Sequence, residues 1–276
     1  MRKHFREVTL LCLAGLAFAL ASPCSAQYSG LDNLGERFAK QLRAQKAVLT
    51  AVSDLDPSDG AVASQGHFFA QFLTNSLEHY GKKLLISEHK DFDDELAAAH
   101  ITAANFASPD VTAALSGKVK EDVVLGGVVT RNQKEYTLEV SAVHISDGRI
   151  LYANKATVQR SDFLDSFAEH FPPEVGQKVY VTSTSEKIGR PECVACPPPP
   201  YDDLARRERV RGTTVFEVLV SPEGRAASVH PARMMGSGLD QTAFETIKRW
   251  RFRPAEDTTG NPVFVVVPIE VTFSLY

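Results

Sequence analysis

Apolar residues in the first two thirds of the chain follow helical and strand-like spacings in turn. Leu31, Leu34, Phe38 and Leu42 recur three or four positions apart, which predicts a helix. The Asp147-Gly148 step separates two alternating runs and predicts a β-hairpin. Further helices are predicted over residues 68–81, 93–104 and 162–170, with one more starting at 108–110, and further strands over 47–55, 83–87 and 122–131. Together these elements predict an α/β domain built on a mixed sheet.

Residues 201–276 show a different order of patterns. Leu239, Ala243, Ile247 and Trp250 form one apolar stripe on a predicted helix. The other predicted elements are a short helix from Asp202, strands over residues 213–220 and 226–230 joined by a turn at 221–224, and a long closing strand over 263–275. We therefore expect an α+β fold, in which a small C-terminal domain with a three-stranded antiparallel sheet and two helices follows the α/β domain.

The first 26 residues have the order of a secretory signal peptide: a basic start, an apolar run from Val8 to Ala21, and the small-residue site Cys24-Ser25-Ala26. This predicts cleavage after Ala26 and a periplasmic protein. Two alternatives keep the protein at a membrane: an uncleaved anchor, for which the apolar run is short because a spanning helix needs about 20 residues, or lipidation at Cys24.

The mature chain then keeps Cys193 and Cys196, spaced C-x-x-C, just before the four prolines that end at Pro200. In an exported protein these two cysteines are expected to form a disulfide. Residues 183–200 lack apolar periodicity and predict an extended linker. The predicted organisation is a signal peptide (1–26), an α/β domain (27–182), this linker (183–200) and the C-terminal domain (201–276).

Charge and motifs argue against several function classes. Residues 27–200 carry 17 basic and 23 acidic side chains and residues 201–276 carry 10 of each, so neither part has the basic excess of a nucleic-acid-binding domain. We find no catalytic motif, and predict no cofactor and no metal site. The acidic and histidine residues around the helix at 93–104 match no metal-binding spacing and are interpreted as a helix first turn. These residues are Glu88, His89, Asp91, Asp93, Asp94 and His100; His67, His79 and His144 are interpreted as isolated histidines.

Residues 31–170 are similar in their order of elements to the N-terminal domain of TolB and to CsgG-like and FlgO-like envelope domains. The similarity rests on the strand near residues 46–52, the segment ending near Glu88, the "DVVLGG" run at 122–127 and the glycine-turned hairpin. It implies a role in the cell envelope without catalysis.

Residues 197–276 resemble the C-terminal domain of TonB, the energy-transducing periplasmic protein. The residues that carry this resemblance follow the family's order and spacing. They are Pro200-Tyr201 with Ala205, Gly212-Thr213, Glu223-Gly224-Arg225, Ser237, Leu239-Asp240 with Ala243, Trp250-Arg251-Phe252, Pro254-Ala255 and the terminal strand.

The TonB resemblance implies binding by strand addition, in which an extended partner peptide pairs with the edge of the last strand. The implied partner-binding residues are Phe264, Val265, Val266, Val267, Ile269 and Val271, with pairing interrupted at Pro268. Arg249 and Arg251 could add contacts to an anionic envelope partner. The same strand could instead form a homodimer.

The hypothesis from the sequence is therefore a non-catalytic periplasmic binding or scaffold protein with an envelope protein as partner, such as a peptide of an outer-membrane protein. Two alternatives remain open at this stage. One is a TonB-type energy transducer retained by its N-terminal helix, and the other is an envelope thiol–disulfide protein that uses Cys193 and Cys196.

Overall fold

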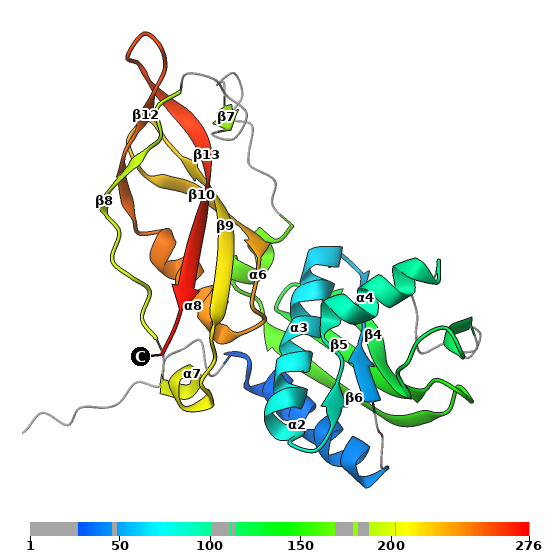
Figure 1. Ribbon diagram of the computed structural model, residues 1–276. Helices are drawn as coiled ribbons and strands as arrows, with labels where there is room; N and C mark the ends of the chain where they lie inside the picture. The colour runs from blue at the N-terminus through cyan, green and yellow to red at the C-terminus, as the bar shows by residue number, and fades with distance from the viewer. Residues whose placement is uncertain are drawn as a thin grey trace, which may run out of the picture.

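The computed structural model of the chain describes residues 27–45, 49–100, 111, 114–168, 179–181, 188–201 and 203–275. The predicted signal peptide and the helix start predicted at residues 108–110 lie outside the described residues. Figure 1 shows two sheets with their helices, one from each half of the chain. The order of helices and strands agrees with the predicted α+β class.

The N-terminal half is a mixed sheet with the strand order β3-β1-β4-β5-β6. Strands β3, β1 and β4 are parallel, whereas β4, β5 and β6 are antiparallel and β5–β6 is the hairpin predicted around Gly148. A short strand, β2, pairs in parallel with the second half of β4. The strands are β1 (Leu49–Val52), β2 (Asp56–Ser58), β3 (Leu85–Ile86), β4 (Val123–Arg131), β5 (Glu135–His144) and β6 (Ile150–Gln159).

Helices cover both faces of this sheet. On one face lie α2 (Ser29–Ala44) and α3 (Ala63–Tyr80), whose aromatic and leucine side chains join the main core. On the other face lies α4 (His89–Ala98), where Phe92 and Leu96 pack on Val124 and Val143. Adjacent residues of one strand alternate between the two faces, so Val123 and Leu125 belong to the first core and Val124 to the second.

The C-terminal half is built on a sheet with the order β10-β9-β13-β12, to which β7 adds on β13. The three long strands are the predicted antiparallel set, and β12 and β7 extend it with two short strands. Helix α8 begins where Ser237 accepts a hydrogen bond from the backbone N–H of Leu239 at 3.3 Å. The elements are β7 (Val179–Val181), α7 (Asp203–Glu208), β9 (Gly212–Val220), β10 (Ala226–Arg233), α8 (Gly238–Ile247), β12 (Ala255–Glu256) and β13 (Pro262–Phe273).

The predicted linker is extended and contains a strand. In it β8 (Glu192–Ala195) pairs with β11 (Arg251–Arg253), immediately after α8. The indole Nε1 of Trp250 donates to the backbone oxygen of Pro197 at 3.0 Å. The linker is thus attached to the C-terminal domain rather than standing apart from it.

The two halves meet at α6 (Asp162–Ser166), which packs against α8 and β10. The rings of Phe163 and Phe244 lie 5.5 Å apart in an edge-to-face arrangement. The Asn75 amide donates to the backbone oxygens of Met235 and Gly236 at 2.8 and 3.0 Å. One hydrophobic cluster runs through both halves, so the halves share a core.

Candidate functional site

The closing strand β13 carries all six apolar residues that the sequence singled out for partner binding. Their side chains divide between the two faces of the sheet. Val265 and Val271 are buried in the main core, where Val267 and Ile269 pack against them and α8 covers the face. Phe264 and Val266 lie on the opposite face with Leu219. Because these side chains already pack within the domain, what β13 offers to a partner is its main chain.

The main chain of β13 has a long inner edge and a partly covered outer edge. Its inner edge pairs with β9 from Val265 to Phe273. On its outer edge, Pro262 and Val263 pair with β12, and Phe264 to Val266 pair in parallel with β7. Within the described part of the chain, no strand pairs with residues 267–273 on that outer side. We refer to this stretch, residues 267–273, as the open edge.

The outward face of the open edge is polar and the inward face apolar. Pro268, Glu270 and Thr272 are exposed, whereas Val271 and Phe273 are buried. Thr272 Oγ1 lies 2.9 Å from Thr213 Oγ1 on β9, a cross-strand hydrogen bond. Pro268 has no N–H, so a continuous ladder of donors on this edge begins only after it.

The predicted arginines lie beside this sheet, at the end of α8. Arg249 and Arg251 are exposed, and the Arg251 guanidinium donates to the backbone oxygens of Arg249 and Trp250 at 3.2 and 2.9 Å. Their aromatic neighbours Trp250 and Phe252 pack against the core. The predicted disulfide between Cys193 and Cys196 is present, with 6.0 Å between the two Cα atoms, and lies on β8.

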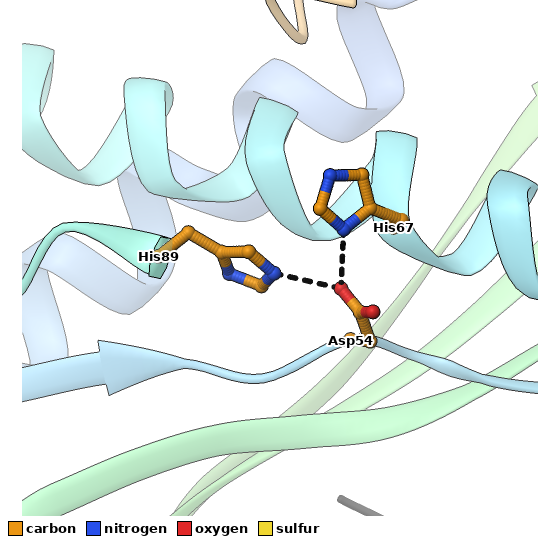
Figure 2. Close-up of side chains that lie close together, drawn as sticks. All are labelled: Asp54, His67 and His89. Atoms are coloured by element: carbon orange, nitrogen blue, oxygen red, sulfur yellow. Dashed lines mark hydrogen bonds and ion pairs between the residues drawn. The ribbon is translucent and has the colours of Figure 1, made fainter. Parts of the chain in front are cut away.

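A second cluster of functional groups lies in the N-terminal half, where Asp54, His67 and His89 converge (Figure 2). The carboxylate oxygen Oδ1 of Asp54 lies 2.9 Å from His67 Nδ1 and 2.7 Å from His89 Nε2. The other ring nitrogen of His89 lies 2.8 Å from the backbone oxygen of Val52. Asp93, one turn further along α4, places Oδ2 3.5 Å from His89 Nε2. We call Asp54, His67 and His89 the histidine cluster.

The contacts in the histidine cluster shift the pKa values of its members. Burial raises the pKa of Asp54, but the hydrogen bonds and charges of His67 and His89 lower it by more, so this carboxyl titrates well below its usual range. Burial lowers the pKa of His89, but its hydrogen bond to Asp54 and the charge of Asp93 raise it by more, and the net pKa is raised. Both shifts favour the charged forms.

Sequence reasoning missed the histidine cluster because its members belong to three separate elements. Asp54 follows β1, His67 lies on α3 and His89 opens α4. The pattern assigned the acidic residues beside His89 to the first turn of a helix, and it treated His67 as isolated. The only available signal was position: Asp54 and His89 each follow a strand, and β1 and β3 are parallel neighbours whose carboxyl ends meet at one edge.

The C-terminal half is thus a small α+β domain whose last strand exposes part of its main chain along one edge. Residues 197–275 match the family described as Gram-negative bacterial TonB protein C-terminal. This segment is a TonB C-terminal domain, as the sequence resemblance predicted.

A curated relative is similar over part of the chain. It is "Protein TonB" of Vibrio cholerae serotype O1 (strain ATCC 39315 / El Tor Inaba N16961), 30% identical over 97 residues. The match covers 34% of this chain and 39% of the relative's length, so most of each chain lies outside it.

Solved structures share only a distant likeness with this chain. The LpoB C-terminal domain from Salmonella enterica has a TM-score of 0.38 at 15% identity and covers 49% of this chain and 98% of its own. The NMR structure of E. coli LpoB has a TM-score of 0.39 at 15% identity, covering 49% and 68%. Lipoprotein GNA1162 from Neisseria meningitidis has a TM-score of 0.34 at 13% identity, covering 42% and 82%.

Proposed function

We propose that this protein is a non-catalytic binding or scaffold protein of the bacterial cell envelope, whose TonB C-terminal domain captures an extended partner peptide by strand addition. The observation that carries the proposal is the open edge of β13. Residues 267–273 pair with β9 on one side, and among the described residues they have no strand partner on the other. An unpaired strand edge is a template for a further strand.

The strand β7 supports this proposal from within the chain. It is a three-residue segment, remote in sequence from β13, that lies in parallel on Phe264, Val265 and Val266. The outer edge of β13 therefore already accepts one added strand. A partner peptide would pair with the open edge on the same side of β13, next to β7.

Affinity would come from main-chain hydrogen bonds, each contributing about 0.5–1.5 kcal/mol net. Ordering a flexible peptide offsets part of this gain. The exposed side chains of Glu270 and Thr272 would contact the partner's side chains and supply selectivity. Arg249 and Arg251, exposed at the end of α8, would favour an anionic partner.

Thiol exchange, the catalytic alternative, is disfavoured by the position of the cysteines. A reactive C-x-x-C pair gains its low thiol pKa at a helix N-terminus or beside cationic groups. Here Cys193 and Cys196 lie on or next to strand β8 and not at a helix N-terminus. The arginines of the paired strand β11 donate elsewhere, Arg251 to backbone oxygens and Arg253 to Glu192. The disulfide closes a short loop within the linker, and the pairing of β8 with β11 holds that loop against the segment that follows α8.

Energy transduction, the other alternative, depends on residues 1–26, which lie outside the described residues. Among the described residues, no helix combines the length and the apolar character that crossing a membrane requires. The intact mass of the protein from its host's envelope decides between the alternatives. A chain that begins at Gln27 contradicts an N-terminal anchor, and a chain that keeps residues 1–26 in the inner membrane supports one.

Strand addition can be tested by site-specific photo-crosslinking in the host. A photoreactive residue at Thr272 should capture an envelope protein, and mass spectrometry should map the adduct to an extended segment of that partner. A synthetic peptide of this segment should bind the purified protein and protect from hydrogen exchange the amides within residues 267–273 that face the open edge.

The matched control places the same photoreactive residue at Thr157, another exposed threonine on an end strand, β6. We expect no shared adduct from that position. Equal adducts from both positions, or a peptide that binds without protecting residues 267–273, would contradict strand addition at β13.

A further inference from the structure

The histidine cluster lies where the fold gathers loop residues, at the carboxyl ends of neighbouring parallel strands. Strand β1 ends at Val52 and β3 at Ile86, and the two are paired in parallel. Asp54 follows the first strand and His89 the second. In open α/β sheets this end of the strands is the usual position of ligand sites.

A hydrogen bond to the backbone fixes the orientation of the His89 ring. Because the Val52 carbonyl can only accept a hydrogen bond, Nδ1 of His89 carries the hydrogen and donates it to Val52 at 2.8 Å. Nε2 is thereby directed at Asp54. The His89 side chain is only 4% exposed, so this orientation is held by packing. A histidine that donates one ring N–H to a backbone carbonyl can use its other nitrogen to bind a metal. Here Zn²⁺ would displace the hydrogen that Nε2 shares with the Asp54 carboxylate.

The ligand atoms form a set that suits zinc. Nε2 of His89, Nδ1 of His67 and a carboxylate oxygen of Asp54 all lie within 4.8 Å of one another. Asp93 Oδ2 lies 3.5 Å from His89 Nε2 but outside this set, and its side chain, 40% exposed, would have to turn to supply a fourth ligand. Imidazole nitrogens with carboxylate oxygens are zinc ligands, and four of them satisfy its tetrahedral preference.

The cluster can open enough to admit the ion. With bonds of about 2.0–2.2 Å, ligand atoms of a tetrahedral zinc lie about 3.3–3.5 Å apart. The separations of 2.7 and 2.9 Å at Asp54 must therefore widen by roughly 0.4–0.8 Å. The side chains that would move, Asp54 and His67, are 40% and 50% exposed, whereas buried His89 stays in place.

The local charge also fits a divalent cation. The N-terminus of α4, where His89 stands, is the positive end of a helix dipole and opposes a bound cation. The carboxylates of Asp54 and Asp93 supply two negative charges at the same point and offset this effect.

We propose that Asp54, His67 and His89, with Asp93 as the fourth ligand, bind one Zn²⁺ ion. The ion would link the end of β1 to α3 and to the start of α4, which are otherwise joined here by hydrogen bonds and ion pairs (Figure 2). The proposal concerns the N-terminal half alone and does not depend on peptide capture by β13.

The test is a competition titration of the full chain, freed of metal and kept under non-reducing conditions, between Zn²⁺ and a chromophoric chelator. The expected result is one Zn²⁺ ion per chain. His67→Ala and Asp54→Asn should each weaken binding at least about tenfold, because each removes a direct ligand and even outer-sphere partners are worth 10–100-fold. His79→Ala, which removes a histidine from the same helix α3, should stay within about twofold of the parent chain.

Asp54→Asn is nearly isosteric and His67 is half exposed, so both variants are expected to fold, which circular dichroism checks. In the parent chain, added Zn²⁺ should raise the midpoint of thermal unfolding, and this rise should vanish in both variants. X-ray absorption at the zinc edge should show two imidazoles at about 2.0–2.1 Å. Absence of stoichiometric Zn²⁺ uptake, unchanged affinity in His67→Ala, or a preference for Cu²⁺ with no measurable Zn²⁺ site would overturn the proposal.

Discussion

The two larger sheets of this protein differ in how their faces are covered, and the difference separates two kinds of candidate functional surface. The N-terminal sheet has α2 and α3 on one face and α4 on the other. The C-terminal sheet has α8 on one face, and among the described residues its other face carries only a small cluster around Phe264. The doubly covered sheet presents side chains at its strand ends, in the histidine cluster. The singly covered sheet presents main chain along the open edge.

The two halves nevertheless share one hydrophobic cluster. A substitution that disrupts this shared cluster should have the largest effect on stability. Phe163→Ala removes a fully buried ring that contacts Phe68, Phe167 and Phe244. Large-to-small changes of this kind cost about 3–5 kcal/mol. Trp250, the single tryptophan, reports on the C-terminal half, and far-ultraviolet circular dichroism reports on both halves.

In the parent chain the two signals should follow one urea transition, and in Phe163→Ala they should separate. The matched control is Phe92→Ala, in the second cluster beneath α4. If the two halves unfold together, Phe92→Ala should also lower the urea midpoint of the Trp250 transition. A Trp250 midpoint unchanged by Phe92→Ala would show that the halves unfold independently.

A buried carboxyl of the C-terminal half gives the next effect. Burial raises the pKa of Asp240 to about 6, although the backbone N–H groups of Met235 and Ser237 donate to it at 3.0 and 2.9 Å and favour the charged form. A raised pKa means that the folded state holds the proton more tightly than the unfolded state. The free energy of unfolding should therefore fall as pH rises from about 4 to about 6, by up to about 3 kcal/mol, and then level off.

Asp240→Asn should remove this slope, which urea unfolding between pH 4 and 7 measures. Carboxyls with lowered pKa values act in a lower window: the pKa of Asp257 is about 2, so its contribution is lost only as pH falls below about 4. If the free energy of unfolding depends on pH equally in Asp240→Asn and in the parent chain, Asp240 is not the group responsible for this dependence.

The smallest effect concerns the linker. Reducing the Cys193–Cys196 disulfide, or replacing both cysteines by serine, should cost about 2 kcal/mol or less, because the closed loop is short. The change should appear mainly in Trp250 fluorescence, since its indole donates to Pro197 directly after this loop. A loss as large as that of Phe163→Ala would mean that the linker, and not the shared core, holds the C-terminal half together.

Sequence patterns predicted the long elements of both halves. Helices α2, α3 and α8, the β5–β6 hairpin and β13 have clear periodicity, α8 also has a capping residue and the hairpin a turn residue, and the predicted disulfide is confirmed. The short strands were not predicted. They are β2, β7, β8, β11 and β12. These strands of two to four residues are too short for a period, and all but β12 depend on a partner remote in the chain, as β7 does on β13.

The candidate sites, too, were predicted only in part from the sequence. The sequence placed the apolar residues of β13 on the last strand, but their burial against α8 and the pairing of Phe264–Val266 with β7 depend on packing. The contact between His67 and His89 likewise requires α3 and α4 to meet at the end of β1. The interface around Phe163 and Phe244 was beyond reach because no local pattern records which domain faces another.

The position of β7 limits the length of a partner peptide that could pair with β13. A peptide laid along β13 from Phe273 toward Val267 runs into the place that Val179–Val181 already occupies. At about 3.4 Å per residue, the open edge is short, and the backbone of β7 bounds it at one end. If the proposed strand addition occurs, this edge would select partner peptides by the length of their extended segment as well as by their side chains.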